Sequence, residues 1–446
     1  MTATAGECLA CGREIEKTAG PGRAPAYCTQ ACRQRLYRER EQTSALPVQE
    51  LIADLGDRLR KLRPVTRDDA FHTDVEALSG PFTQLRRIAR QTRADEREEE
   101  RVTPEPVTNP TASFSSSAAS DDVFATVTEQ YGRELRVHCY RMLGSYDEAE
   151  DLTQETFLRA WRARDALSCV ADPRAWLYKI ATRLCLDFLR EHDRHPTTYA
   201  PVPGVDSGVG PPPVRVTWLQ PFPDDQLPDK PAPMHEPDAA AVASETLELA
   251  FLTAVQKLPA RQRAAVLLRD VAGWSAQETA DLLGSGTASA NSAVQRGRAA
   301  LRQALPGRRE DWSLREPGSG EQALVRRFMD AMAHSDIDAM VELVREDAVL
   351  TMPPNPFWFT GRDALLTFLR PNLDPASPKF AGHWRTVPVR ANGRMAMAGY
   401  LQRPGTSVYR AQIIDVLRIE AGEDRIAEIT TFEPHLFPAF GLPMTL

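Results

Sequence analysis

Proline placement constrains the fold of this chain more than any other feature of its sequence. The stretch from His195 to Asp238 contains the run Pro211-Pro212-Pro213 and several further prolines. Proline lacks a backbone N–H and clashes with the preceding helical turn, so this stretch can form neither a helix nor a central strand. A second break, rich in Pro, Thr, Ser and Ala, covers residues 101–122 and is predicted to be a flexible linker. The 446 residues should therefore fold as several domains.

The pattern changes again near residue 321. Two helices are predicted there, at about 321–345 and 362–369, and strand-like alternation follows, as in Val408–Ile419. Asn392-Gly393 is predicted to be a hairpin turn. The predicted segments are a cysteine-bearing element at 1–45, a charged helical segment at 46–100, the flexible linker at 101–122, a helical module at 123–193, a Pro-rich linker at 194–240, a second helical module at 241–306 and an α+β domain at 321–442.

Composition limits the class of protein. No apolar run approaches the roughly 18 to 20 residues that span a bilayer, and Met1–Gly12 has no apolar signal-peptide core. We therefore expect a cytoplasmic protein that makes no membrane contact. The net charge of −7 argues against a protein that coats nucleic acid indiscriminately, although local patches can differ.

The first helical module contains two distinctive helices. One begins near Asp147 with a cluster of acids, which the helix macrodipole favours; a solvated acidic helix end is the alternative interpretation. The other begins with Asp172-Pro173, an N-cap followed by proline. Beside its apolar stripe, one face carries Trp176, Lys179, Arg183 and Arg190. An aromatic ring with cations suits single-stranded DNA, whereas a core-edge tryptophan with ordinary surface charges explains the pattern equally well.

The second helical module has the layout of a helix-turn-helix. Ser275 and Glu278 form a predicted capping box, and Gly284 should end that helix. A short turn leads into a predicted second helix at Ala288–Leu305. The amides of Asn291 and Gln295 share a face and could pair with base edges, and Arg296 and Arg298 could reach phosphates; the alternative is a hairpin packed for structure alone.

These two blocks resemble the sigma-70 family, specifically the extracytoplasmic-function sigma factors. The resemblance covers His138–Arg164, Asp172–Arg190 and the second module from Leu258 to Leu301. It implies a multidomain fold: an all-α region 2 bundle and an all-α helix-turn-helix region 4, followed by an α+β domain. It also implies two partners, promoter DNA and core RNA polymerase, the latter through its β′ clamp helices and β flap.

The resemblance implies residue roles as well. The polymerase-binding residues would be Asp147, Glu150, Asp151, Gln154, Glu155 and Trp161. The helix at Asp172–Arg190 and the loop before it, Asp165–Ala171, would open the −10 element and hold a flipped base. Region 4 would read the −35 element through Asn291, Ser292, Gln295 and Arg296. Gly297 stands where the family usually has alanine, so we expect a less rigid recognition helix.

Residues 321–440 resemble the SnoaL-like, cone-shaped fold shared with nuclear transport factor 2. Asp347, His383 and Asp415 are the candidate acid–base groups, but no spacing among them demands chemistry, and no catalytic residue is predicted. The resemblance implies a regulatory domain that makes intramolecular contacts or binds a small ligand near Trp358 and Trp384. Two alternatives to a sigma factor remain open: a ligand-sensing helix-turn-helix regulator that does not bind core polymerase, and an enzyme built on the cone.

Four cysteines near the start of the chain form two close pairs, Cys8 with Cys11 and Cys28 with Cys32. In a reducing compartment, such spacing favours tetrahedral structural Zn²⁺ in a ribbon or knuckle. The alternative is four unligated thiols in a disordered extension. The isolated Cys139, Cys169 and Cys185 are expected to be buried thiols.

Overall fold

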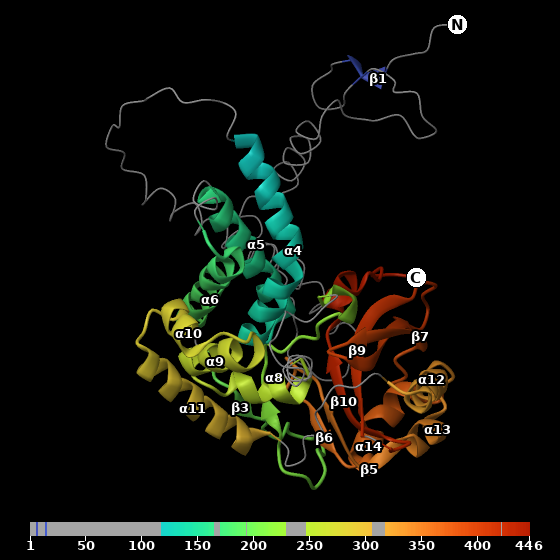
Figure 1. The fold of residues 1–446 in the computed structure, drawn as a ribbon. Helices are drawn as coiled ribbons and strands as arrows, with labels where there is room; N and C mark the ends of the chain where they lie inside the picture. The colour runs from blue at the N-terminus through green and yellow to red at the C-terminus, as the bar shows by residue number, and fades with distance from the viewer. Residues whose placement is uncertain are drawn as a thin grey trace, which may run out of the picture. The chain divides into compact units, whose positions relative to one another are not determined.

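The computed structural model describes residues 117–164, 170–192, 194–228, 247–305, 317–420 and 422–446, together with two short strands near the start of the chain (Figure 1). The chain forms two compact units, residues 1–112 and 113–446. Within the first unit only the antiparallel pair β1 (Gly6–Glu7) and β2 (Glu14–Ile15) is described. The four predicted zinc ligands and the predicted helical segment at 46–100 lie outside the described residues.

Three helices form the first helical module: α4 (Ser117–Leu143), α5 (Tyr146–Arg162) and α6 (Pro173–Glu191). The α4 helix begins at Ser117, so the predicted flexible linker at 101–122 is wrong for its last six residues; no proline follows Pro110 there, and Ala118-Ala119 favours helix. The predicted cap of α6 is confirmed, since the Ala175 N–H donates to Asp172 Oδ1 at 3.1 Å. Cys139 and Cys185 are buried in this module, as predicted, while Cys169 lies outside the described residues.

The Pro-rich linker is packed where it is described, rather than being a loose tether. It contains the strand pair β3 (Thr197–Thr198) and β4 (Val214–Arg215) and a 3-10 turn, η2 (Asp224–Gln226). Phe222 is wholly buried, with its ring 4.9 Å from that of Tyr140. The prolines exclude helix, but the apolar residues between them still gain about 1.5–3 kcal/mol each on burial.

The second helical module comprises α8 (Leu249–Gln256), α9 (Ala260–Val266), the π-helical turn η3 (Leu267–Val271), α10 (Ala276–Leu282) and α11 (Thr287–Ala304). Buried Arg263 ties this module to the first. Its guanidinium donates to the Met142 carbonyl at 2.5 Å and to Gln256 Oε1 at 2.7 Å. Burial lowers the pKa of Arg263 to about 10, which leaves the group charged at neutral pH.

The C-terminal domain is α+β, as predicted, with a six-stranded sheet in the order β6-β5-β10-β9-β8-β7 (Figure 1). Its helices are α12 (Ser319–Ala333), α13 (Ile337–Glu342) and α14 (Arg362–Leu373). Its strands are β5 (Val344–Thr351), β6 (Trp358–Thr360), β7 (His383–Ala391), β8 (Arg394–Gln402), β9 (Arg410–Ile419) and β10 (Ile426–Phe432). Only β5 and β10 pair in parallel; the other neighbours are antiparallel.

Local sequence explains where this domain agrees with and departs from expectation. The predicted turn is confirmed, because Asn392 and Gly393 join β7 to β8 with φ of 56° and 70°. The single helix predicted at 321–345 is wrong. Ser335 adopts φ of 55° and ends the first helix, and Asp336 caps α13 by accepting from the Ala339 N–H at 3.0 Å.

Both faces of the sheet are buried. Leu417 and Ile429 pack in one core with the helices α12–α14. Ile414 and Tyr400 join the other core, which also contains Phe222 and the apolar residues of both helical modules. The C-terminal domain therefore shares a continuous core with the helical part of the same unit. No helix among the described residues is long and apolar enough to cross a membrane.

Candidate nucleic-acid interface

The predicted helix-turn-helix is present in the second module. The Ser275–Glu278 capping box is complete: the Glu278 N–H donates to Ser275 Oγ at 3.2 Å, and the Ser275 N–H donates to Glu278 Oε2 at 2.7 Å. Gly284 has φ of 59°, which a residue with a side chain rarely adopts, and it ends α10. These local features fix the turn that leads into α11.

One face of α11 is exposed and polar. It carries Asn291, Ser292, Gln295 and Arg296, and Arg296 Nη1 donates to Ser292 Oγ at 2.5 Å. The opposite face, which includes Ala290 and Val294, is buried against the module. Amide and guanidinium groups on a solvent-facing helix are the side chains that read base edges in the major groove.

Arg298 differs from the other predicted DNA-binding residues. Its guanidinium forms a bidentate ion pair with Asp270: Nε donates to Oδ2 at 2.9 Å and Nη2 donates to Oδ1 at 2.5 Å. This hydrogen bonding raises the pKa of Arg298. The structure therefore places Arg298 in an internal contact rather than on the polar face. Gly297 has a packing role that the sequence interpretation missed: a Cβ there would lie 2.5 Å from Val266 Cγ2, so glycine lets α11 approach α9 closely.

The predicted single-strand-binding face of α6 is only partly solvent-facing. Arg183 and Arg190 are exposed, and Arg190 pairs with Asp187 at 3.0 Å. Trp176 and Lys179 are half-buried, and Trp176 packs against the core. Of the loop that the resemblance assigns to base capture, residues 165–169 lie outside the described residues.

The α5 helix presents a mixed acidic and apolar face. Asp147, Asp151, Gln154 and Trp161 are exposed, whereas Glu150 and Glu155 are half-buried. Leu158 shares this face and is 52% exposed, although the sequence interpretation missed it. The periodicity of this face, at steps of three and four residues from Asp147, could have identified Leu158. This face therefore combines exposed acidic groups with an exposed leucine and tryptophan.

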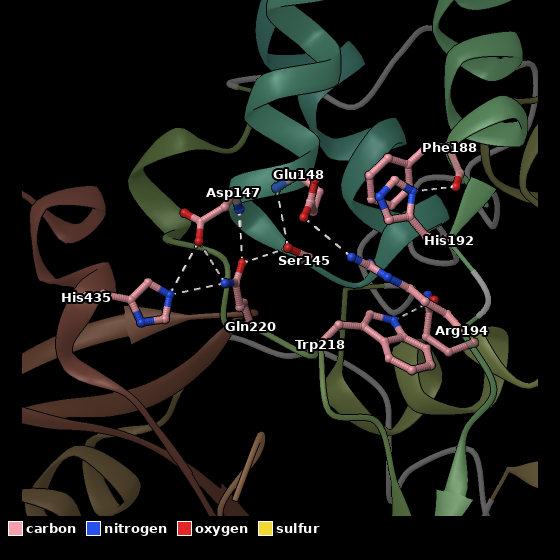
Figure 2. A network of polar contacts seen from close by, with 10 residues as sticks. Ser145, Asp147, Glu148, Phe188, His192, Arg194, Trp218, Gln220 and His435 are labelled. Atoms are coloured by element: carbon pink, nitrogen blue, oxygen red, sulfur yellow. Dashed lines mark hydrogen bonds and ion pairs between the residues drawn. The ribbon is translucent and has the colours of Figure 1, made fainter. Parts of the chain in front are cut away.

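Gln220 of the linker connects the start of α5 to the C-terminal part of the chain, as Figure 2 shows. Its Oε1 accepts from Ser145 Oγ at 2.9 Å and its Nε2 donates to Asp147 Oδ2 at 2.8 Å. His435, in the 3-10 segment η5 (Pro434–Phe440), also contacts Asp147, with 3.3 Å between His435 Nε2 and Asp147 Oδ2. Burial lowers the pKa of His435, but the bond to Asp147 and the charges of Asp147 and Glu433 outweigh it and raise the pKa overall.

The candidate acid–base groups of the C-terminal domain are not brought together. Strand register places His383 five residues along the strands from the row of Asp415, or about 16 Å at 3.3 Å per residue. Asp347 lies toward the opposite end of the strands, in the irregular part of β5 beside Ile426 and Glu428 of β10, three to five residues or about 10–16 Å from the row of Asp415. Asp347 pairs with Arg345 at 2.8 Å on the surface. Asp415 is buried, accepts from Thr431 Oγ1 at 2.6 Å, and has its pKa raised to about 7 by burial.

The expected ligand position near Trp358 and Trp384 is not supported by the structure. These tryptophans lie on β6 and β7, the opposite edges of the six-stranded sheet. At about 4.8 Å per strand, the two edges are roughly 24 Å apart measured along the sheet, and no described contact links the two tryptophans. Among the described residues, no cluster of His, Cys, Asp and Glu could hold a metal ion.

Comparison with known proteins agrees with this arrangement. Family models match the chain at residues 127–195 (Sigma-70 region 2), 248–301 (Sigma-70, region 4) and 325–429 (SnoaL-like domain). The chain is 38% identical over 336 residues to the ECF RNA polymerase sigma factor SigG of Mycobacterium tuberculosis, which covers 72% of this chain and 85% of SigG. It is 29% identical over 305 residues to SigJ of the same organism, covering 66% of this chain and 88% of SigJ.

A solved structure is also similar. The crystal structure of the Mycobacterium tuberculosis extracytoplasmic function sigma factor SigJ aligns with 73% of this chain and 99% of that chain, at 23% identity and a TM-score of 0.44. The sequence relationship to SigG and the three matched domains, in the order that the fold shows, identify the family. This chain belongs to the extracytoplasmic-function RNA polymerase sigma factors.

Proposed function

We propose that this protein binds core RNA polymerase and directs promoter-specific initiation of transcription. The observation that carries the proposal is the presence, in one chain, of a capped helix-turn-helix with an exposed polar face and of a helix with an exposed acidic and apolar face. The α11 face would read the −35 element, and α6 with the loop before it would open the −10 element. The α5 face would dock on the β′ clamp helices, and region 4 on the β flap. A protein with these partners works in the cytoplasm.

Run-off transcription with purified core enzyme and candidate promoters tests the proposal. For polymerase binding, Leu158→Asp should weaken the complex at least tenfold, because it puts a charge into the apolar part of the docking face. Val209→Asp is the matched control, since Val209 is fully exposed in the linker. If neither variant nor the wild type binds core enzyme, the alternative of a ligand-sensing regulator that works without polymerase replaces this proposal.

For promoter reading, Gln295→Ala should lower run-off output from a matched promoter by about 5- to 100-fold, the range expected for losing one good base contact. Gln303→Ala is the matched control, because Gln303 is exposed on the same helix two turns further along. Equal effects of the two substitutions would argue against the assigned reading face.

We further propose that the C-terminal domain regulates rather than catalyses. The separation of Asp347, His383 and Asp415 supports this, since general acid–base catalysis needs its groups within hydrogen-bond reach of one substrate. The N-terminal cysteines remain a proposed zinc site. Their spacing supports it, as does the strand pair β1–β2, whose two strands flank Cys8 and Cys11 in sequence.

A further inference from the structure

Charge is distributed unevenly along the C-terminal domain. The stretch 379–414 contains no aspartate or glutamate, and its cations are Lys379, Arg385, Arg390, Arg394, Arg403 and Arg410. The acids that flank this stretch are engaged elsewhere. Asp374 accepts from the Ala376 N–H at 2.9 Å within its own turn. Asp415 is buried and accepts from Thr431 Oγ1. Because the whole chain has a net charge of −7, so basic a stretch contrasts with the rest of the protein.

Strand register gathers part of this charge at one end of the sheet. His383 at the start of β7 pairs with Gln402 at the end of β8, and Leu401 of β8 pairs with Arg410 at the start of β9. At about 4.8 Å per strand and 3.3 Å per residue, the backbones of Arg385 and Arg410 are about 10 Å apart. This end of the sheet, with the loop before β7 and the turn after β8, is here called the basic rim. Its basic residues are Lys379, His383, Arg385, Arg403 and Arg410.

The basic rim faces solvent. Lys379, Arg385 and Arg410 are exposed, and so is every residue of the turn from Pro404 to Val408. Neither Arg385 nor Arg410 forms an ion pair with any residue in the described part of the chain. The Arg385 guanidinium lies 4.7 Å from the Tyr409 ring centroid, and this cation–π contact leaves its N–H groups available. Both guanidinium groups can therefore bind an external anion.

The phosphate backbone of DNA is the partner that fits this surface. Arginine suits phosphate, because its planar fork can donate two hydrogen bonds to one phosphate group. Duplex DNA carries one negative charge per roughly 1.7 Å of its axis, so several residues of the rim can contact phosphates at once. Phosphates carry no sequence information, so such a surface binds DNA without reading bases.

An anionic membrane surface is the main competing partner, since it attracts the same cations. Segments that lie in a membrane interface are typically amphipathic helices with a broad apolar face. The basic rim instead consists of strand ends and turns. The large apolar side chains beside it, Val408, Met444 and Leu446, are only 37–44% exposed. The structure therefore favours DNA.

We propose that the basic rim binds the phosphates of duplex DNA without regard to sequence, in addition to the promoter contacts of α6 and α11. This inference rests on the proposed function, which brings the protein to DNA. The rim lies wholly within the C-terminal domain and shares no residue with α6 or α11. Its contribution can therefore be removed without changing either helix.

The double variant Arg385→Ala/Arg410→Ala tests the proposal. The measurement is fluorescence anisotropy of a labelled duplex of random sequence, titrated with the full chain at several salt concentrations. Each lost phosphate contact lowers the slope of log affinity against log salt concentration by about 0.9, so the double variant should lose about 1.8. If the two contacts contribute nothing at about 1 M salt, the affinity at about 0.1 M should fall by roughly 60-fold. A promoter duplex should lose the same factor.

Two further double variants are the controls. Arg370→Ala/Arg425→Ala removes the same charge from the same domain. Arg370 pairs with Asp338 at 3.5 Å, and Arg425 follows Asp424 at the opposite end of the strands. This variant should keep the affinity and salt slope of the wild type. Arg385→Lys/Arg410→Lys keeps the charge and should also keep the slope, which separates loss of charge from loss of packing on Tyr409.

The proposal is overturned if the wild type does not bind the duplex, or if the alanine variant of the rim matches the wild type in affinity and salt slope. It is also overturned if that variant keeps its DNA affinity but loses binding to phosphatidylglycerol vesicles, which would assign the rim to a membrane. Run-off transcription by the wild type with core enzyme is measured separately. Absence of any transcript would reject the proposed function, whereas transcription with a salt slope unchanged by the rim substitutions would reject the rim alone.

Discussion

Asp415 gives a prediction with a sign and a magnitude. This carboxyl group lies on β9 with an exposed fraction of only 5%, and it accepts a hydrogen bond from the Thr431 hydroxyl. Burial raises its pKa from 3.8 to about 7, and the hydrogen bond from Thr431 only partly opposes that rise. The folded state therefore holds this proton more tightly than the unfolded state does. The resulting stabilisation is complete below pH 3.8 and is lost as the pH rises through about 7.

The size of the effect follows from the pKa difference. One pKa unit corresponds to about 1.36 kcal/mol, so ionised Asp415 reduces the free energy of unfolding by at most about 4 kcal/mol above pH 7. Roughly 2 to 3 kcal/mol of this loss falls between pH 5 and pH 8. Asn is the matching neutral side chain, because it can accept from Thr431 and carries a donor where the protonated acid carries its hydroxyl. Asp415→Asn should therefore be more stable than wild type at pH 8, with much less dependence on pH.

Urea unfolding of the full chain at pH 5 and pH 8 tests this, with hydrogen exchange of β9 and β10 peptides reporting the C-terminal domain separately. Asp347→Asn is the control, because its exposed carboxylate pairs with Arg345, and that hydrogen bond lowers its pKa. Asp347→Asn should give no gain at pH 8. The reasoning is refuted if wild type and Asp415→Asn lose stability equally between the two pH values.

Three further predictions concern other parts of the chain. Gly297→Ala should destabilise region 4 by on the order of 1–2 kcal/mol in thermal melts, because overpacking against Val266 outweighs the gain in helix propensity. Gly320→Ala is the control: its new Cβ would have no atom within 4 Å, so the variant should be as stable as the wild type or more stable. Affinity for core enzyme should rise from pH 6 to pH 8, because His435 loses its proton and releases Asp147. His435→Gln should make the affinity nearly independent of pH in this range. If the affinity of His435→Gln depends on pH as strongly as that of the wild type, this contact is not the cause. Metal analysis of the reduced full chain should find about one Zn²⁺ per molecule. Replacing the four N-terminal cysteines by serine should remove this zinc. Finding no zinc in the wild type would end the proposal.

Local sequence determined what could be predicted here. The capping residues Asp172 and Ser275 and the Asn392-Gly393 turn act through neighbours within four residues, so their positions could be read directly and were confirmed. The order of the helical modules and the α+β domain was also predictable, because prolines and a change in periodicity separate them.

Long-range packing determined what could not be predicted. Nothing in the linker's composition indicates that Phe222 is wholly buried, since its partner Tyr140 is far away in sequence. Turn preference placed Asn392 at a hairpin tip but could not show that the tip is buried against three other segments. Arg298 was assigned to DNA by its charge, and only the structure shows its pairing with Asp270.

Two of the polar contacts between the C-terminal part and the first helical module, His435–Asp147 and Asn392–Tyr140, differ in strength, and this difference suggests an order of events. The His435–Asp147 pair is about half exposed, and such pairs contribute at most about 1 kcal/mol. The amide of Asn392 is wholly buried, so leaving it unpaired would cost about 1–3 kcal/mol for each group. If core polymerase docks on α5 as proposed, it would first contact the exposed Leu158 and Trp161, and neither residue takes part in these two contacts. We expect it then to displace His435 at small cost, whereas the buried Asn392–Tyr140 contact costs more to break and should persist longer.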